Sequence, residues 1–382
     1  MSIQFQETSF RLSASLPGHG NTPDSAGDRL IGVLRGEGCG PEVVDAALHI
    51  LDRVNATASG KIEIQFGGEI GLPAKRLKGK VLTEEITEFC DSVFQRKGAV
   101  FCGPGGGRFV YELRTFFDLY CKFTPVKALQ ILDDTGVIMP AGRADVDIVI
   151  VRENTGGLYY GEWGYFTRGT VTSAFQRFEY NQNQVERILE VAIRLAGMRR
   201  NQLTVVLKPG GVPAVCELWK QTLDSLMLVY DVDARILEVD NAMYQLIANA
   251  RDFDVVVAPN MFGDVLSDGA SLLMGARGLS YSGNFGSSGA SVFQTGHGAA
   301  HDLAGTGRAN PIGQIFSLAM LLRETFGMNN HAHAIESAVT ETLRQGWRTP
   351  DISADGCTIV GTSEMAKRIA DNLEPLLDTI AA

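Results

Sequence analysis

The sequence contains no apolar run of membrane-spanning length and no excess of positive charge. Its 382 residues carry a formal net charge of −10, which argues against nucleic acid or an anionic membrane surface as a partner. The first residues also lack the basic flank and apolar core of a secretory signal. We therefore expect a globular, cytoplasmic protein that acts on small molecules.

Paired cysteines are also missing. The six cysteines are scattered and form no CxxC motif: Cys39, Cys90, Cys102, Cys121, Cys216 and Cys357. Such spacing predicts reduced core thiols, and it disfavours both a zinc site and a catalytic thiol. The chain is long enough for a large core and two domains, and its 43 glycines indicate many tight loops.

Short apolar runs alternate with amphipathic segments along most of the chain. We expect strands at 30–34, 62–66, 99–102, 126–131, 147–152, 203–207, 235–239 and 254–258, and helices that include 84–97, 182–197 and 213–228. This alternation predicts an α/β fold with a parallel or mixed sheet flanked by helices. Residues 158–171 have the pattern of a protruding hairpin, and the chain after about 309 is expected to be helical. Residues 1–27, rich in Ser, Gly, Pro and Thr, are expected to form a mobile extension.

A glycine-rich loop follows the first expected strand. Gly36, Gly38 and Gly40 lead into a helix that begins with Pro41, which superficially suggests a dinucleotide fingerprint. The spacing is GxGxG, however, and no acidic residue ends the next strand. The loop is expected to line a site without holding a pyrophosphate.

Asp264 and Asp268 are the candidates on which the functional prediction depends. They lie four residues apart in NMFGDVLSD (260–268), so a helix would place both carboxylates on one face. On these nine residues alone, an exposed acidic face is one interpretation. A site for a hard divalent cation such as Mg²⁺ or Mn²⁺ is the other.

Four further segments occur with this one: GEGCGPEVVDAAL (36–48), ELRTFFDLYCKFTPVK (112–127), VRENTGGLYYGE (151–162) and HGAAHDLAGTGRANP (297–311). Together the five closely resemble the β-decarboxylating dehydrogenases, the family of isopropylmalate, isocitrate, homoisocitrate and tartrate/D-malate dehydrogenases. The isopropylmalate type is the nearest. The resemblance runs from about Leu30 to the C-terminal end.

The resemblance implies a two-domain homodimer with shared active sites. Residues 28–119 and 275–382 would form a large cofactor-binding domain. Residues 120–274 would form a small dimerisation domain, with an arm near 158–175.

The resemblance also implies roles for individual residues. Mg²⁺ or Mn²⁺ would be held by Asp264 and Asp268 together with Asp240 of the partner subunit. The partner subunit's Lys208 would take the proton of the substrate's hydroxyl group, for which its amine must be neutral part of the time. Tyr159 would protonate the enol carbon after CO₂ has left.

Arg114 and Arg152 match arginines that bind substrate carboxylates. The residues ahead of Arg114, among them Val110, would face the substituent on the substrate's third carbon. Thr124 stands where the family has a second arginine, and nearby Lys122 could compensate as a point charge.

The cofactor implied is NAD. Asp302 would accept hydrogen bonds from the adenosine ribose, where a 2′-phosphate would meet a like charge. His297, Gly298 and Asn310 would contact the adenosine, and the loop 275–286 would lie near the diphosphate.

Several of these residues have simpler interpretations. Lys208 could be a surface lysine, Tyr159 a packing aromatic, and Arg114 the partner of Asp118. Arg152 could pair with a neighbouring glutamate.

We therefore expect NAD- and metal-dependent oxidative decarboxylation of a 3-substituted malate. Because several contact residues depart from the family pattern, we expect the reaction to belong to a specialised biosynthetic pathway. The alternatives are a D-malate/tartrate type and a non-catalytic regulatory subunit related to isocitrate dehydrogenase.

Overall fold

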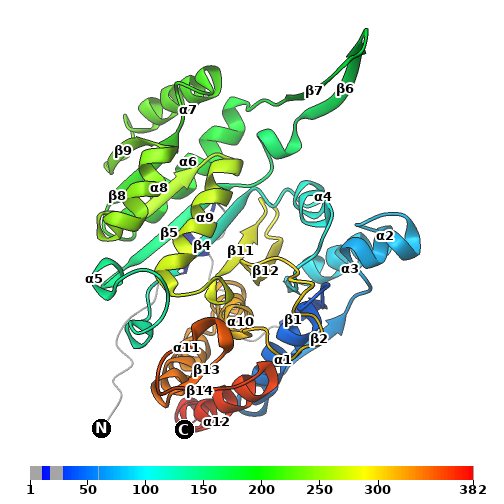
Figure 1. Ribbon diagram of the computed structural model, residues 1–382, viewed down its shortest axis with the longest axis vertical. Helices are drawn as coiled ribbons and strands as arrows, with labels where there is room; N and C mark the ends of the chain where they lie inside the picture. Colours follow the sequence, from blue (N-terminus) through cyan, green and yellow to red (C-terminus); the bar gives the residue numbers. More distant parts are fainter. Residues whose placement is uncertain (1–10, 18–28, 59, 382) are drawn as a thin grey trace.

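The computed structural model describes residues 11–17, 29–58 and 60–381 and is built around one mixed sheet of ten strands (Figure 1). The strand order is β2-β1-β3-β12-β11-β4-β5-β10-β8-β9. These strands are β1 (Arg29–Leu34), β2 (Ile62–Phe66), β3 (Ala99–Cys102), β4 (Cys121–Lys127), β5 (Asp147–Glu153), β8 (Gln202–Leu207), β9 (Asp233–Glu238), β10 (Val255–Ala258), β11 (Tyr281–Phe285) and β12 (Ser291–Thr295). Most neighbours are parallel. The pairs β12–β11, β11–β4 and β4–β5 are antiparallel.

Helices cover the sheet and gather at its two ends (Figure 1). They are α1 (Gly40–Thr57), α2 (Gly71–Lys78), α3 (Glu84–Gln95), α4 (Phe109–Phe116), α5 (Pro140–Arg143), α6 (Gln182–Gly197), α7 (Pro213–Leu226), α8 (Val239–Ala248), α9 (Asn260–Met274), α10 (Ile312–Phe326), α11 (Asn329–Arg344) and α12 (Thr362–Ala381). In the described ranges, none of them is both long enough and apolar enough to cross a bilayer. The α/β fold with a mixed sheet flanked by helices is confirmed.

The first and last parts of the chain fold together. Strand β12 pairs in parallel with β3, and helix α1 packs against α10 and α12. The sheet continues without a break from these elements into β4, β5 and β10. The domain limits expected near 120 and 274 stay a prediction.

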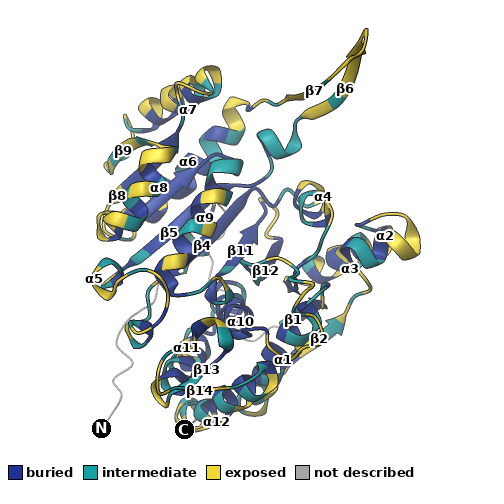
Figure 2. Cartoon of the chain, viewed as in Figure 1, coloured by how far each residue is buried: buried dark blue, intermediate teal, exposed yellow. Residues whose placement is uncertain are grey.

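Two strands leave the body of the molecule as an arm, here called the arm hairpin. Among the strands that the structure describes, β6 (Glu162–Arg168) and β7 (Val171–Arg177) pair only with each other, and they are exposed along most of their length (Figures 1 and 2). A two-stranded ribbon is marginally stable in water by itself. Large apolar side chains such as Trp163, Tyr165 and Val171 nevertheless point into solvent on it.

The sequence pattern misplaced one central strand and missed two others. The strand expected at 126–131 is β4, which begins at Cys121. Its apolar pattern is interrupted by the polar residues Lys122 and Thr124, both of which are buried. Strands β11 and β12 fall in a Gly- and Ser-rich stretch that has the composition of a loop. The region expected to lie near a diphosphate therefore includes a buried strand, residues 281–285.

Part of the expected mobile extension is docked on the protein. Residues 12–15 form a 3₁₀ turn, and the buried Leu16 follows it. The backbone N–H groups of Ser13 and Leu12 donate to the buried carboxylate of Glu324 in α10, at 2.8 and 3.2 Å. A distant carboxylate thus contacts a segment that has no apolar pattern of its own, and the mobility of the extension stays a prediction. The remainder of the predicted extension lies outside the described residues.

Candidate active site

Helix α9 brings the two aspartates to the centre of the sheet. It begins at Asn260, directly after β10 and Pro259, and lies over β4 and β5. The Asn260 side chain donates to the carbonyl oxygen of Gly156 at 2.9 Å, which fixes the start of the helix. Asp264 and Asp268 follow on successive turns, so their carboxylates lie on one face as predicted.

Asp264 is an ionised carboxylate in a partly buried position. It forms an ion pair with Arg152, and the Tyr159 hydroxyl donates to its Oδ2 at 2.9 Å. Burial raises the pKa of Asp264, but Arg152, Lys122 and Tyr159 together lower it by more, so the net pKa lies below the ordinary value. Burial and the neighbouring Asp264 raise the pKa of Tyr159, whose phenol therefore keeps its proton.

Arg152 is held rigidly beneath this helix. Its guanidinium is buried, and its Nε donates to the Asn260 side-chain oxygen at 2.9 Å. Its aliphatic stem packs under Gly263, where a Cβ atom would lie only 2.9 Å from the stem carbons. Glycine at this position is what allows α9 to approach β5 so closely.

Two more buried cations lie beside Arg152. Lys122 of β4 is its direct cross-strand partner, and Arg114 comes from α4. Arg114 is 5% exposed and Lys122 is 6% exposed, yet neither side chain forms an ion pair or a hydrogen bond with the residues that the structure describes. Burial, aided by Arg152, lowers the pKa of Arg114 to about 10. Burial, Arg152 and Arg114 lower that of Lys122 to about 7. Asp264 attracts both cations without forming an ion pair with either, so the excess of buried positive charge makes this cluster suited to bind an anion.

The structure gives less direct support for two predicted substrate contacts, Thr124 and Val110. The hydroxyl oxygen of Thr124 is sealed from solvent and has no hydrogen-bond partner among the described residues. Val110 is half-buried and packs against the core under α4. Next to it, Arg108 donates to the carbonyl oxygen of Tyr159 at 2.9 Å and stacks on the Tyr111 ring. A cavity of about 470 Å³ opens beside Arg108 and Tyr111.

Lys208 and Asp240 form a separate cluster. The Lys208 Nζ lies 2.7 Å from Asp240 Oδ1 and 2.6 Å from Glu238 Oε2. The Lys208 ammonium donates hydrogen bonds to both carboxylates, and these raise the pKa of Lys208, with Asp240 the larger contributor. A single chain therefore does not contain the partly neutral lysine that is predicted to act as the base.

The described residues of one chain contain no set of three His, Cys, Asp or Glu side chains that could hold a metal ion. Asp268 instead pairs with Arg277, at 2.5 Å. The donor chemistry of Asp264 and Asp268 still fits Mg²⁺ or Mn²⁺, because both supply hard carboxylate oxygens from successive helical turns. They provide only part of an octahedral shell, so further ligands must come from outside this chain.

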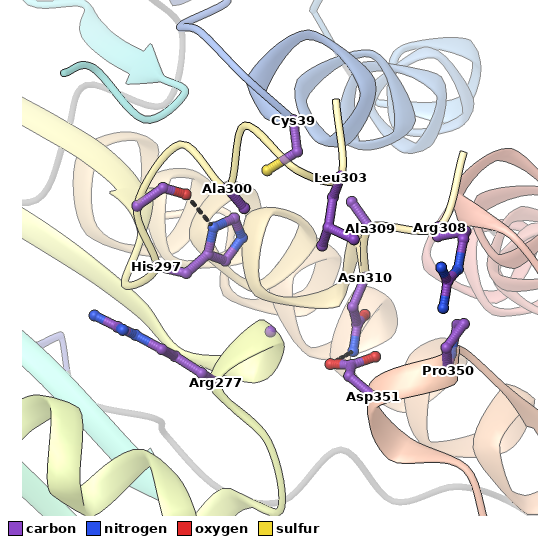
Figure 3. A pocket seen from close by; sticks show the side chains of 12 residues that line it. Cys39, Arg277, His297, Ala300, Leu303, Arg308, Ala309, Asn310, Pro350 and Asp351 are labelled. Atoms are coloured by element: carbon purple, nitrogen blue, oxygen red, sulfur yellow. Dashed lines mark hydrogen bonds between the residues drawn. The ribbon is translucent and has the colours of Figure 1, made fainter. Parts of the chain in front are cut away.

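A second cavity, of about 590 Å³, is lined in part by Arg277, the partner of Asp268 (Figure 3). Most of the predicted cofactor residues line the same cavity. His297, Gly298 and Asn310 line it; the imidazole Nδ1 lies 2.9 Å from the Gly298 carbonyl oxygen. Burial lowers the pKa of His297, which favours a neutral ring at pH 7. Asn310 donates to Asp351 at 3.1 Å.

Other residues of this cavity were not identified from the sequence. Arg277 and Arg308 line it, and both fall within segments assigned to the cofactor. Cys39 lines it at the N-terminal end of α1, where Gly38 (φ +64) passes so close to Ala299 that no side chain would fit. The glycine loop therefore does line a site.

Asp302 is exposed and is not one of the lining residues. Burial is the main cause of the raised pKa of Cys39, and the charge of Asp302 adds a smaller contribution, which places Asp302 near the cavity.

The arrangement of these side chains indicates a class of protein. Buried cations face a pair of carboxylates and a protonated tyrosine, beside a cavity large enough for a second ligand. This arrangement is typical of an α/β enzyme that acts on a small anion with the help of a cofactor.

Comparisons with known proteins identify the family. The model of the family described as isocitrate/isopropylmalate dehydrogenase matches residues 30–369. The 3-isopropylmalate dehydrogenase of Aquifex aeolicus is 36% identical over 363 residues, which cover 91% of this chain and 98% of the relative; that of a Synechococcus strain is 37% identical over 360 residues, covering 89% and 92%. The crystal structure of isocitrate dehydrogenase from Methylococcus capsulatus superposes with a TM-score of 0.80 at 30% identity, covering 91% of this chain and 99% of the other. The chain belongs to the isocitrate/isopropylmalate dehydrogenase family and is a decarboxylating hydroxyacid dehydrogenase, which confirms the resemblance.

Proposed function

We propose that the protein oxidises and decarboxylates a 3-substituted malate, using NAD and Mg²⁺ or Mn²⁺. The observation that carries this proposal is the pair of buried cations, Arg114 and Lys122, which form no ion pair with the described residues and lie near Asp264. A dicarboxylic acid would satisfy both cations. The relatives' name, 3-isopropylmalate dehydrogenase, supports an apolar group on the third carbon.

Each residue of the cleft has a role that follows from its surroundings. Arg114 and Arg152 orient the substrate carboxylates, Arg152 from a position fixed by Asn260. A dication held by Asp264, Asp268 and Asp240 of the partner subunit would withdraw electron density from the substrate oxygens as hydride and CO₂ depart. Tyr159, which keeps its proton, is suited to deliver it to the substrate carbon.

The proton of the substrate's hydroxyl needs a base, and the partner subunit's Lys208 is the candidate. In the single chain the Lys208 pKa is raised by Asp240 and Glu238. Transfer of the Asp240 carboxylate to a dication would remove the larger of these two contacts. We infer that in the dimeric site Asp240 would serve as a ligand of the dication and Lys208 would accept the hydroxyl proton.

We propose that the cavity beside His297 and Asn310 binds NAD, which accepts the hydride. Asp302 nearby disfavours a 2′-phosphate, whereas Arg308 in the cavity lining would attract one. We expect the acidic residue to prevail. A kcat/KM for NADP equal to or above that for NAD would contradict this choice.

We propose that a second copy of the chain covers the arm hairpin and the outer face of α8 and α9. Tyr244 on α8 is 69% exposed and Val265 on α9 is 52% exposed, and the arm hairpin carries exposed aromatic side chains of its own. Burial of such surface stabilises obligate dimers. This homodimer would bring Lys208 and Asp240 to the other chain's α9, in a cytoplasmic enzyme.

Turnover of a substrate panel tests the proposed function. NADH formation is measured with 3-isopropylmalate, D-malate, tartrate and isocitrate, with Mn²⁺ and then with EDTA. The proposal predicts the highest kcat/KM for 3-isopropylmalate or another malate with an apolar substituent, abolished by EDTA. Preference for D-malate or tartrate would indicate the small-substrate type. No turnover of any acid, with NAD binding retained, would indicate a regulatory subunit.

A further inference from the structure

Lys122 occupies an unusual position for a lysine. It lies in the interior of β4, with Arg152 opposite it on β5 and Asn284 opposite it on β11. Residues directly opposite each other share a face of the sheet. Because Arg152 packs beneath α9, Lys122 lies on the same face, under the helix that carries Asp264 and Asp268.

Within the described ranges, the neighbours of Lys122 provide its ammonium group with no hydrogen-bond acceptor. Asn284 donates to the carbonyl oxygen of Val292, and its own side-chain oxygen accepts from Asn154. Asp264 is paired with Arg152, and Asp268 with Arg277. Asp264 and Asp268 attract Lys122, but neither carboxylate forms an ion pair or a hydrogen bond with it in the part of the chain that the structure describes.

An uncompensated buried ammonium lowers stability unless a ligand neutralises it. The lowered pKa of Lys122, about 7, reflects that cost, which arises from burial and from the two adjacent arginines. An aliphatic side chain of similar length would fill the same space without the penalty. A lysine that served only for packing would therefore be the less stable choice.

We propose that Lys122 is a substrate-binding, specificity-determining residue that contacts one carboxylate of the hydroxy acid as a single-point charge. This inference rests on the proposed function and assigns a ligand that the sequence left open between Lys122 and Thr124. The sealed hydroxyl of Thr124 leaves Lys122 as the group on β4 that can reach the anion. The subsite selects a dicarboxylate over a hydroxy acid with one carboxylate.

The test compares Lys122→Met with Lys127→Met. Lys127 is an exposed lysine at the end of the same strand and serves as the matched control. For the best substrate of the panel, Lys122→Met should raise KM about 10- to 100-fold with kcat within about threefold, the effect of removing one charge-assisted hydrogen bond from substrate binding. The Kd for NAD should not change. The thermal midpoint of the variant without substrate should rise, because the buried charge has been removed. Lys127→Met should behave as wild type in all three measurements.

The outcomes separate this inference from the proposed function. An active wild type whose Lys122→Met variant keeps its KM overturns the inference alone. So does a variant with a lower thermal midpoint and a proportional loss of NAD binding, since that is the result of a structural role. A wild type that neither turns over nor binds any acid of the panel overturns the proposed function and this inference with it. As a second variant, Lys122→Arg keeps the charge and should retain substrate binding to within about tenfold.

Discussion

Replacing Arg152 by methionine should destabilise the protein through Asp264. Methionine fills the space of the arginine stem under Gly263 but removes the guanidinium. Breaking a buried ion pair by removing one partner costs about 3–5 kcal/mol. The Asp264 side chain is 37% exposed, so water replaces part of the lost interaction and the lower end applies. With the hydrogen bond to Asn260, worth about 1 kcal/mol, we expect a loss of about 3–4 kcal/mol in the free energy of unfolding.

Equilibrium urea unfolding at one fixed protein concentration measures this loss. A double-mutant cycle with Asp264→Asn isolates the ion pair: the double variant should be more stable than the sum of the single effects predicts, by about 1.5–3 kcal/mol. A coupling energy below about 0.5 kcal/mol would show that Arg152 and Asp264 do not stabilise each other, and would refute the argument that their ion pair stabilises the protein.

Three further changes have defined outcomes. Arg277→Gln frees the Asp268 carboxylate and should tighten Mn²⁺ binding about two- to fivefold in titration calorimetry, the effect of a surface ion pair, whereas weaker binding would contradict the competition. The pKa of Lys122, about 7, predicts that the charged, anion-binding form is lost as pH rises, so KM for the acid should rise between pH 7 and 8.5. Lys122 faces Arg114, Arg152, Asp264 and Asp268, and Lys122→Arg should flatten the profile; an unchanged slope would assign the titration elsewhere. Glu324→Ala removes the acceptor of the Ser13 and Leu12 N–H groups, and limited proteolysis at residues 11–17 should then be at least about tenfold faster. Cleavage at the wild-type rate would mean that other contacts hold this segment.

The sequence predicted the elements whose hydrophobic pattern is undisturbed. Residues 62–66 and 182–197 are a strand and a helix at the expected bounds, because their apolar residues follow the period of each element. The predicted bounds of strand β4 were displaced because its polar residues are buried rather than exposed, which interrupts the apolar pattern. Local pattern does not distinguish a polar residue kept for a ligand from one in a loop.

The candidate site was also predicted only in part from the sequence. The four-residue spacing of Asp264 and Asp268 was enough to place them on one face of a helix. The burial of Lys122 depends on Arg152, thirty residues away in the chain, and on a helix that begins still later. The pairing of Lys208 with Asp240 likewise results from folding, and it raises a pKa that the proposed chemistry needs lowered.

The stoichiometry of the reaction tests the central claim most directly. Purified protein is incubated with 3-isopropylmalate, NAD and Mn²⁺, and NADH and CO₂ are measured in the same sample. The account predicts one CO₂ for each NADH, and no formation of either product once EDTA is present. NADH formed without CO₂, or product formation that EDTA leaves unchanged, would contradict it.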